Sequence, residues 1–121
     1  MLIQKLNSCD EFMAGDGTQL RELLHPDKQS VELRYSLAHA ALPPGQTSVL
    51  HSLTTSEVYY IISGVSREMH IDGENQFVEA GDTVYISPNA KQFICNCGTE
   101  PLIFICIVDP AWRKEDETIF K

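Results

Sequence analysis

The stretch that decides the fold is residues 45–64, which read GQTSVLHSLTTSEVYYIISG. A glycine stands at each end, and His51 and Glu57 lie between them in the spacing G-x5-H-x5-E-x6-G. Glycines of this kind mark turns, and the β-branched and aromatic residues between them favour strands. The stretch therefore predicts two short strands, near residues 49–53 and 57–63, with polar side chains set among apolar ones.

A second stretch with the same character follows at residues 81–96, GDTVYISPNAKQFICN. The Gly-Asp pair at its start and the Ser-Pro-Asn run in its middle are turn signals. They bracket predicted strands at 83–86 and 91–97, and a spacer of sixteen residues, 65–80, separates the two stretches. The order and spacing of the two stretches carry more information than either stretch alone.

Together the stretches resemble the two motifs of the cupin superfamily, G-x5-H-x-H-x3-E-x6-G and G-D-x4-P-x-G-x2-H-x3-N. The chain departs from the first motif where Leu53 replaces the second histidine, and from the second where Gln92 replaces its histidine. Residues 87–89 take the place of the P-x-G turn. The resemblance spans residues 31–108, and it indicates a small single-domain cupin with a degenerate metal-ligand set.

The resemblance implies an all-β fold, the double-stranded β-helix or cupin jelly roll, with little helix. It also implies one cupin domain over residues 1–121. The turn spacing agrees, because apolar runs recur every 8 to 12 residues or so. Helix is expected only as a turn at residues 10–14 and another near the C-terminus. Strands are predicted near 18–24, 31–42, 49–53, 57–63, 66–71, 75–79, 83–86, 91–97 and 101–108, with an Asp72-Gly73 hairpin.

The period of two along a strand predicts which side chains enter the barrel. Between residues 31 and 42 the odd-numbered positions are the more apolar set, so His39 is expected to point inward. The same rule groups His51 with Leu53 and groups Glu57 with Tyr59. It also places Gln92 on the face of Ile94 and Asn96. We therefore expect one pocket that contains His39, Leu53, Tyr59 and Ile94 beside the polar residues.

Three predicted strands are apolar on both faces, at residues 58–62, 93–95 and 102–108. A sheet in a lone small barrel should be wet on one side, so a doubly apolar sheet suggests that its outer face is covered. We expect a two-fold homodimer to cover it. Coverage by the N-terminal segment is the alternative.

In cupins the motif histidines and the glutamate converge on a divalent metal. Carried over position by position, the resemblance leaves His51, Glu57 and Gln92 as metal ligands, and Tyr59 or His39 is a candidate to complete the shell. Zn, Mn, Fe and Ni all remain candidates, because one nitrogen and two oxygen donors do not select among them. The alternative is a metal-free hydrogen-bond network in which His51, or Tyr59 and Gln92, satisfy the buried Glu57.

Composition excludes several classes of function. Nine basic residues against seventeen acidic ones give a net charge of −8, which disfavours nucleic acid and anionic membranes as partners. No apolar run has transmembrane length, and the N-terminus lacks a signal-peptide core, so a cytoplasmic location is expected. The cysteines are expected to be reduced apolar residues. No nucleophile elbow, phosphate loop or dinucleotide fingerprint occurs, which argues against hydrolases, kinases and dehydrogenases.

Four other residues are expected to have structural roles. His25 is assigned to a turn at the surface or a cap, and His70 to solvent beside the hairpin. Trp112 should pack against the barrel as an anchor rather than stack on a ligand. Asp82 should bond nearby backbone in its turn.

The resemblance leads to a functional expectation with one rival. The protein is expected to bind a small organic molecule beside a divalent metal and, if it is an enzyme, to resemble dioxygenases or isomerases. Anionic ligands are disfavoured, because no expected pocket residue is Lys or Arg. The rival is a metal-free cupin module that binds a small molecule or serves only as structure.

Overall fold

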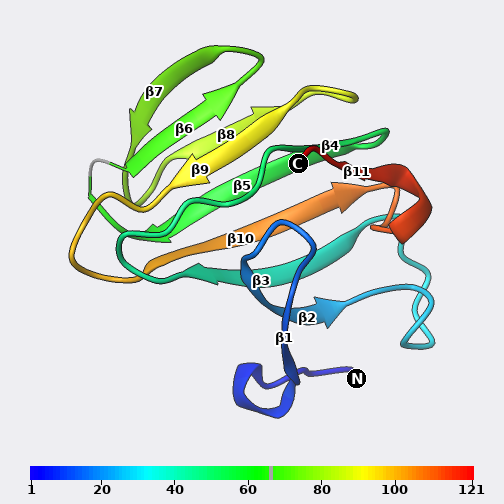
Figure 1. Cartoon of the computed structure of the whole chain (residues 1–121). Coiled ribbons are helices and arrows are strands. Elements are labelled where there is room, and N and C mark those ends of the chain that lie inside the picture. Colours follow the sequence, from blue (N-terminus) through cyan, green and yellow to red (C-terminus); the bar gives the residue numbers. More distant parts are fainter. Residues whose placement is uncertain (66) are drawn as a thin grey trace.

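The computed structural model describes residues 1–65 and 67–121, and it forms two antiparallel sheets that face each other (Figure 1). The first sheet has the strand order β1 (Glu11–Met13), β2 (Gln19–Leu24), β3 (Ser36–Leu42), β10 (Leu102–Asp109), β5 (Ser56–Ser63), β8 (Thr83–Ile86). The second has the order β11 (Glu117–Ile119), β4 (His51–Leu53), β9 (Gln92–Cys95), β6 (Arg67–Ile71), β7 (Glu74–Val78). The expected all-β jelly roll is confirmed.

Among residues 1–65 and 67–121, helix is confined to two short 3-10 turns, η1 (Leu6–Ser8) and η2 (Lys114–Asp116). The expected C-terminal turn corresponds to η2. The turn expected at residues 10–14 is wrong, because this segment pairs with β2 as strand β1. In the described part of the chain, no helix has the length and apolar character needed to cross a membrane. The cytoplasmic location remains a prediction.

Strand positions follow the sequence pattern closely in the middle of the chain and less well at its ends. The strand expected at 31–42 begins only at Ser36, and β11 has no counterpart among the expected strands. The start of the strand expected at 66–71 touches residue 66, which lies outside the described residues. Positive φ angles at Asp72 (49°) and Gly73 (82°) confirm the hairpin turn.

The core lies between the sheets and is organised around strand β10. Its residues alternate between buried and half-buried along the strand, and Phe104 at its middle is 1% exposed. The Phe104 ring packs on the ring of Tyr59 from the neighbouring strand β5, with centroids 4.5 Å apart. A buried aromatic residue of this kind contributes about 3–5 kcal/mol relative to alanine.

Strand β3 presents the face opposite to the one that the sequence pattern predicts. Ala40 is fully buried and pairs in register with Phe104, so the even-numbered residues of β3 face the core. His39 is half-buried and therefore lies on the outer face of the sheet, and its expected entry into the barrel is wrong. The pattern misleads because both faces are apolar, with Leu37 and Ala41 outside and small alanines inside.

The motif glycine Gly64 has a clear structural reason. Its φ is +132°, and a Cβ atom at this position would lie 3.1 Å from the Leu102 Cδ1 atom. A residue with a side chain would be strained in its backbone and crowded against strand β10. In the second motif, Asn89 takes the left-handed conformation in the Ser-Pro-Asn turn (φ 68°), a conformation that asparagine tolerates. The frame of the two motifs is thus preserved.

Candidate functional site

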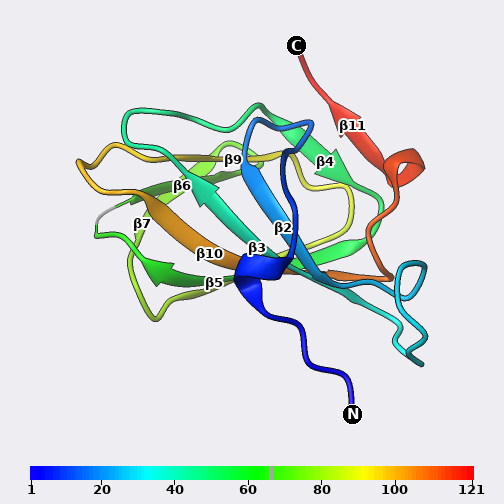
Figure 2. The same cartoon turned by 90° about the horizontal axis from the view of Figure 1, so that it is seen from below.

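A cavity of about 200 Å³ lies between the sheets, at the end where β3 and β5 begin and β10 ends. Figure 1 shows the connection between β1 and β2 bending over β3 and β10, and this connection supplies part of the cavity wall. Strand β11, which extends toward the C-terminus beside β4 in Figure 2, supplies another part. The polar side chains in the lining are Asp16, Thr18, Glu22, Ser36, His51, Glu57, Tyr59, Cys106, Trp112 and Glu117.

Glu57 lies at the start of β5 and is 7% exposed. Gln92 donates a hydrogen bond from Nε2 to Glu57 Oε1 at 2.7 Å, and Tyr59 donates its hydroxyl to Gln92 Oε1 at 2.9 Å. No described residue forms a hydrogen bond with the other carboxyl oxygen, Oε2. The Oε1 atom of Glu57 is thus held by Gln92, which Tyr59 holds in turn. The Oε2 atom remains available to the cavity.

His51 is 3% exposed and is held through both ring nitrogens. Nδ1 lies 2.7 Å from the backbone oxygen of Val49, so this nitrogen carries a proton and donates it. Nε2 faces the Asp16 Oδ2 atom at 3.5 Å. The other Asp16 oxygen, Oδ1, accepts from the backbone N–H and the hydroxyl of Thr18, at 3.0 and 2.7 Å. The loop between β1 and β2 is thereby tied to β4 across the cavity.

The carboxyl groups of the cavity are difficult to ionise together. Burial raises the pKa of Glu57 from 4.5 to about 8, the Gln92 hydrogen bond opposes this rise, and the charges of Asp16 and Glu117 add to it. Burial likewise raises the pKa of Glu117, against the opposing effect of His51. Burial holds the pKa of Tyr59 well above 10, which keeps its hydroxyl available as a donor to Gln92. Near neutral pH Glu57 is therefore largely protonated.

The three expected metal ligands, His51, Glu57 and Gln92, do not all have a donor atom free to bind a metal ion. The side-chain oxygen of Gln92, the atom that would bind a metal, accepts the Tyr59 hydroxyl, and its amide nitrogen faces Glu57. Leu53 is buried beside them and has no donor atom. Within residues 1–65 and 67–121, no three His, Cys, Asp or Glu side chains are grouped so as to hold a metal ion. These residues therefore do not fit the divalent ion that the resemblance implied.

The structure places four of the expected site residues on the cavity wall: His51, Leu53, Glu57 and Tyr59. Gln92 (0% exposed) and Ile94 (1% exposed) lie in the core instead, and neither is among the described residues that line the cavity. The expected pocket position of Ile94 is therefore wrong, as is that of His39.

The sequence reasoning missed the contribution of the two terminal segments to the site. Asp16 comes from the β1–β2 connection, whereas Trp112 and Glu117 come from the segment after β10. The only local signal was the Asp-Gly-Thr run at residues 16–18, in which the aspartate bonds backbone two residues on. Trp112 was expected to act only as a packing anchor, but it lines the cavity.

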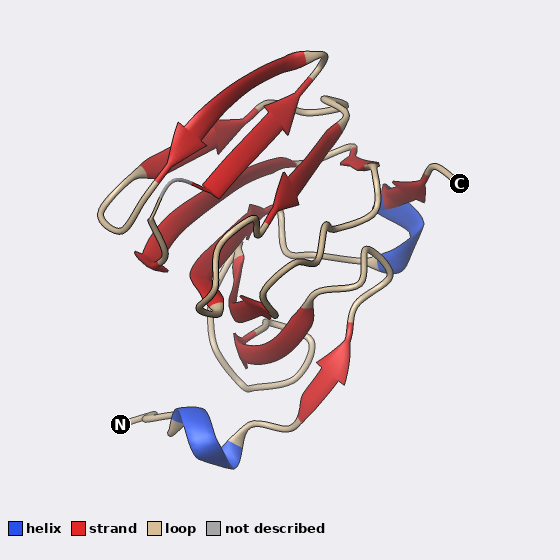
Figure 3. Cartoon of the chain, turned by 60° about the vertical axis from the view of Figure 1, so that its left-hand side comes forward, coloured by secondary structure: helices blue, strands red, loops and turns tan. Residues whose placement is uncertain are grey.

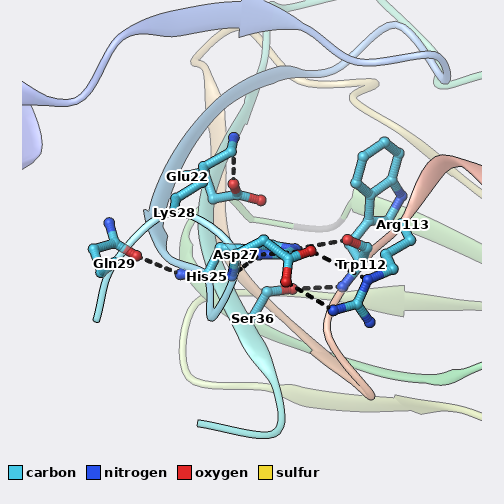
Figure 4. A network of polar contacts seen from close by, with 8 residues as sticks. All are labelled: Glu22, His25, Asp27, Lys28, Gln29, Ser36, Trp112 and Arg113. Atoms are coloured by element: carbon cyan, nitrogen blue, oxygen red, sulfur yellow. Dashed lines mark hydrogen bonds and ion pairs between the residues drawn. The ribbon is translucent and has the colours of Figure 1, made fainter. Parts of the chain in front are cut away.

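A buried histidine holds the C-terminal segment in place (Figure 4). His25 is 4% exposed, its Nε2 lies 2.7 Å from the Trp112 backbone oxygen, and its Nδ1 accepts the Asp27 N–H at 3.0 Å. Arg113 forms two hydrogen bonds to the Asp27 carboxylate, at 3.0 and 3.2 Å. The expected surface position of His25 is thus wrong, although the residue does cap its turn. This network, which we call the C-terminal clasp, positions Trp112 at the cavity.

Two smaller expectations have mixed outcomes. His70 is not simply solvated, because its ring stacks on Phe93 with centroids 4.2 Å apart and its Nε2 lies 2.5 Å from Glu68 Oε1. Asp82 bonds nearby backbone as expected, since its Oδ2 accepts the Glu79 N–H at 2.8 Å. Neither residue belongs to the cavity.

Comparison with known proteins agrees with this architecture. The family model described as "Cupin domain" matches residues 38–108. The chain belongs to the cupin family. This cupin is 38% identical to the uncharacterized protein MJ1618 of Methanocaldococcus jannaschii, over 91% of this chain and 87% of that protein.

Solved cupin structures superpose well on this cupin. The cupin 2 conserved barrel domain protein of Salinispora arenicola has a TM-score of 0.77 at 21% identity, over 95% of this chain and 91% of that one. Pac13, a nucleoside dehydratase whose Streptomyces variants were solved with uridine, has a TM-score of 0.78 at 17% identity, over 100% and 92%. At these identities the likeness establishes the cupin barrel and leaves the chemistry to the site itself.

Proposed function

We propose that the protein binds a small organic molecule in the cavity, with polar contacts to Asp16, His51 and Glu57, and that binding needs no metal ion. The observation that carries this proposal is the combination of these three buried polar side chains with an otherwise largely apolar wall. Concave, mostly apolar sites with a few fixed polar groups are typical of small-molecule binding. The Tyr59–Gln92 pair supports the metal-free form, because it occupies the oxygen that a metal would need.

The size and charge of the cavity restrict the ligand. A volume of about 200 Å³ lies below the roughly 300–1,000 Å³ of pockets for drug-sized ligands, so the ligand is compact. Of the described residues that line the cavity, none is Lys or Arg, which disfavours an anionic ligand. The uridine complexes of Pac13 support the idea that a barrel of this shape takes a small organic molecule.

Glu57 is the residue through which the cavity could exchange a proton with its ligand. Its pKa of about 8 lies near neutral pH, where a carboxyl group can act as acid or as base. Its Oε2 atom has no hydrogen-bond partner among the described residues, so a ligand can reach it. If the protein is an enzyme, this geometry favours proton-transfer chemistry of the isomerase or dehydratase kind over oxygen activation at a metal.

A cavity-filling substitution tests the proposal. Ala38 lines the cavity on β3, so Ala38→Leu should occupy part of its volume without removing any polar group. Ala80 is exposed and outside the cavity, so Ala80→Leu serves as the matched control. Saturation-transfer NMR with a library of compact neutral and cationic compounds should give ligands whose signals are lost in the Ala38 variant and kept in the control. Ligands that bind both variants equally would place binding elsewhere.

We also propose that the outer face of the first sheet is the interface of a homodimer. Tyr60 and Ile62 on β5 and Tyr85 on β8 remain 47%, 46% and 63% exposed there, beside the half-buried outward isoleucines of β10. The N-terminal segment lies at the lower edge of the molecule in Figure 3, and the exposure of Tyr60, Ile62 and Tyr85 means that it does not cover them. A second copy related by a two-fold axis would bury the same apolar surface on both chains.

A further inference from the structure

The cavity contains more carboxyl groups than positive partners. Asp16, Glu57 and Glu117 line it together with one group that can become positive, His51. A fourth acid in the lining, Glu22, has a lysine of its own, because the Lys28 Nζ atom lies 2.5 Å from its Oε1, although this buried oxygen accepts no hydrogen bond of ordinary geometry. Of the other three acids, Asp16 accepts two hydrogen bonds from Thr18 and Glu117 accepts one from the Trp112 side chain, but His51 is the one group beside them in the described lining that can carry a positive charge.

His51 can serve only one of these acids closely. Its Nδ1 is engaged by the Val49 carbonyl, and its Nε2 faces Asp16 at 3.5 Å. Glu57 has a neutral amide on one oxygen and no described hydrogen-bond partner on the other, and the residue is only 7% exposed. Because Glu57 Oε2 is not one of the fully buried oxygens that lack a partner, it is open to the cavity, where a donor on a ligand can bond it.

Electrostatic coupling among the acids supports the same conclusion. The charges of Asp16 and Glu117 each raise the pKa of Glu57, and the charge of Asp16 raises that of Glu117. A positive charge placed near Glu57 and Glu117 would oppose the rise in their pKa values and favour their ionised forms. The acids are nevertheless not grouped as metal ligands in the described part of the chain. An ion larger than a bare metal suits this wider arrangement better, because N–H donors approach oxygen at about 2.7–3.0 Å, whereas metal bonds are about 2 Å.

Aromatic rings complete the lining on the other side. Tyr59 and Phe104 pack against each other in the wall, Trp112 borders the cavity near Glu117, and Phe12 lies at the edge strand β1. Aromatic faces attract organic cations and also pack against their apolar parts. The described lining combines acids with aromatic rings and contains neither Lys nor Arg. This composition favours a cation over a neutral ligand.

We propose that the ligand of this cavity is a compact organic cation, a primary amine or a related ammonium on an apolar body, whose charged nitrogen lies between Glu57 and Glu117. This inference rests on the proposed function, because it specifies the ligand class of the same cavity. It predicts that affinity depends on the charge of the ligand more than on its shape.

Three probes of nearly equal size test the inference: benzylamine, benzyl alcohol and benzoate. Trp112 is the one tryptophan of the sequence and lines the cavity, so its fluorescence reports binding directly, with titration calorimetry as the second measurement. Benzylamine should bind on the order of tenfold or more tightly than benzyl alcohol, and benzoate should bind most weakly. Equal affinities for the amine and the alcohol, or a preference for benzoate, would overturn the cation inference while leaving small-molecule binding intact. Failure of all three probes to bind at millimolar concentration would count against both proposals.

Substitution of the acids provides the matched control. Glu57→Gln and Glu117→Gln should each reduce the affinity for benzylamine more than the affinity for benzyl alcohol, so that the preference for the amine is largely lost. Glu115 is exposed two residues before Glu117 and outside the cavity, so Glu115→Gln should leave both affinities unchanged. A loss of benzylamine affinity in Glu115→Gln equal to that in Glu117→Gln would show a long-range charge effect and overturn the assignment of the nitrogen site.

Discussion

Among single residues, Glu57 is the buried carboxyl group whose pKa is raised most clearly toward neutral pH. The residue is buried, and its carboxyl group accepts one hydrogen bond, from the Gln92 amide. The neutral carboxyl is therefore the form that the folded protein prefers near neutral pH, which gives the stability of the protein a specific pH dependence.

We predict that the free energy of unfolding contributed by Glu57 falls between about pH 4.5 and pH 8. The pKa of this acid is raised on folding, from 4.5 to about 8, so the folded state holds the proton over this interval while the unfolded state has lost it. Raising the pH through this interval therefore destabilises the fold, by on the order of several kcal/mol in total.

Glu57→Gln tests the direction of this pH dependence. The amide imitates the neutral carboxyl group and can still accept the hydrogen bond from Gln92. Urea unfolding between pH 5 and pH 9 should show a fall in the wild type that is much shallower in the variant. The variant should be the more stable protein at pH 9. A wild type that gains stability through this range would contradict the assignment.

Several individual site residues were predictable from the sequence, and others were not. The motif spacing was enough to bring His51 and Glu57 to one wall, because it fixes the two positions relative to the turns that flank their strands. Asp16 and Glu117 could not be found this way, since tertiary packing of the terminal segments brings them to the cavity. The side-chain oxygen of Gln92 is occupied by the Tyr59 hydroxyl. This contact joins strands that are far apart in the sequence, so the sequence pattern does not predict it.

At the scale of elements, the strands of the motifs follow the sequence and the edge elements do not. Strands β1 and β11 have three residues each, too few for a periodic pattern, and they exist because neighbours offer backbone partners. The face of β3 was wrong because its two faces are nearly equal in apolar character. Small inward residues such as Ala38 leave the space that becomes the cavity.

The C-terminal clasp gives a prediction at this scale. His25→Ala removes the Nε2 bond to the Trp112 carbonyl and the acceptor for the Asp27 N–H, both in a buried position. We expect the free energy of unfolding to fall by about 1–3 kcal/mol. Hydrogen exchange should become faster in the segment that contains β11, including the Phe120 N–H, which donates to the Leu50 carbonyl at 2.9 Å.

His70→Ala is the control for this experiment, because His70 lies outside both the clasp and the cavity. It should leave exchange at Phe120 unchanged. Unaltered exchange of the Phe120 amide in His25→Ala would mean that β11 is held by its pairing with β4 alone, without help from the clasp.

At the scale of the whole molecule, the outer face of the first sheet is the feature that a lone chain explains least. Its side chains are apolar across β5, β8 and β10, whereas the cavity end of the barrel is acidic. Association through the sheet face would leave the cavity free, so binding and assembly can be tested separately.

We predict a dimer, with twice the chain mass of 13.6 kDa, in sedimentation experiments at micromolar concentration. Ile62→Lys places a charge on the proposed interface at a side chain that is already 46% exposed, so it should yield a folded monomer. Phe77→Lys, at a 68% exposed position on β7 of the other sheet, should remain dimeric. A wild type that sediments as a monomer would contradict the interface.

We propose that the Tyr59–Gln92–Glu57 network occupies the metal position of a cupin barrel and leaves a cavity that binds its ligand without a metal ion. Calorimetric titration of untagged, chelator-treated protein with Zn²⁺, Mn²⁺, Fe²⁺ and Ni²⁺ tests it most directly. We expect no saturable binding in the micromolar range for the wild type, and new affinity in the double variant Leu53→His with Gln92→His, which restores two nitrogen donors. Stoichiometric micromolar binding by the wild type that is lost in Glu57→Gln would mean that the cavity is a metal site.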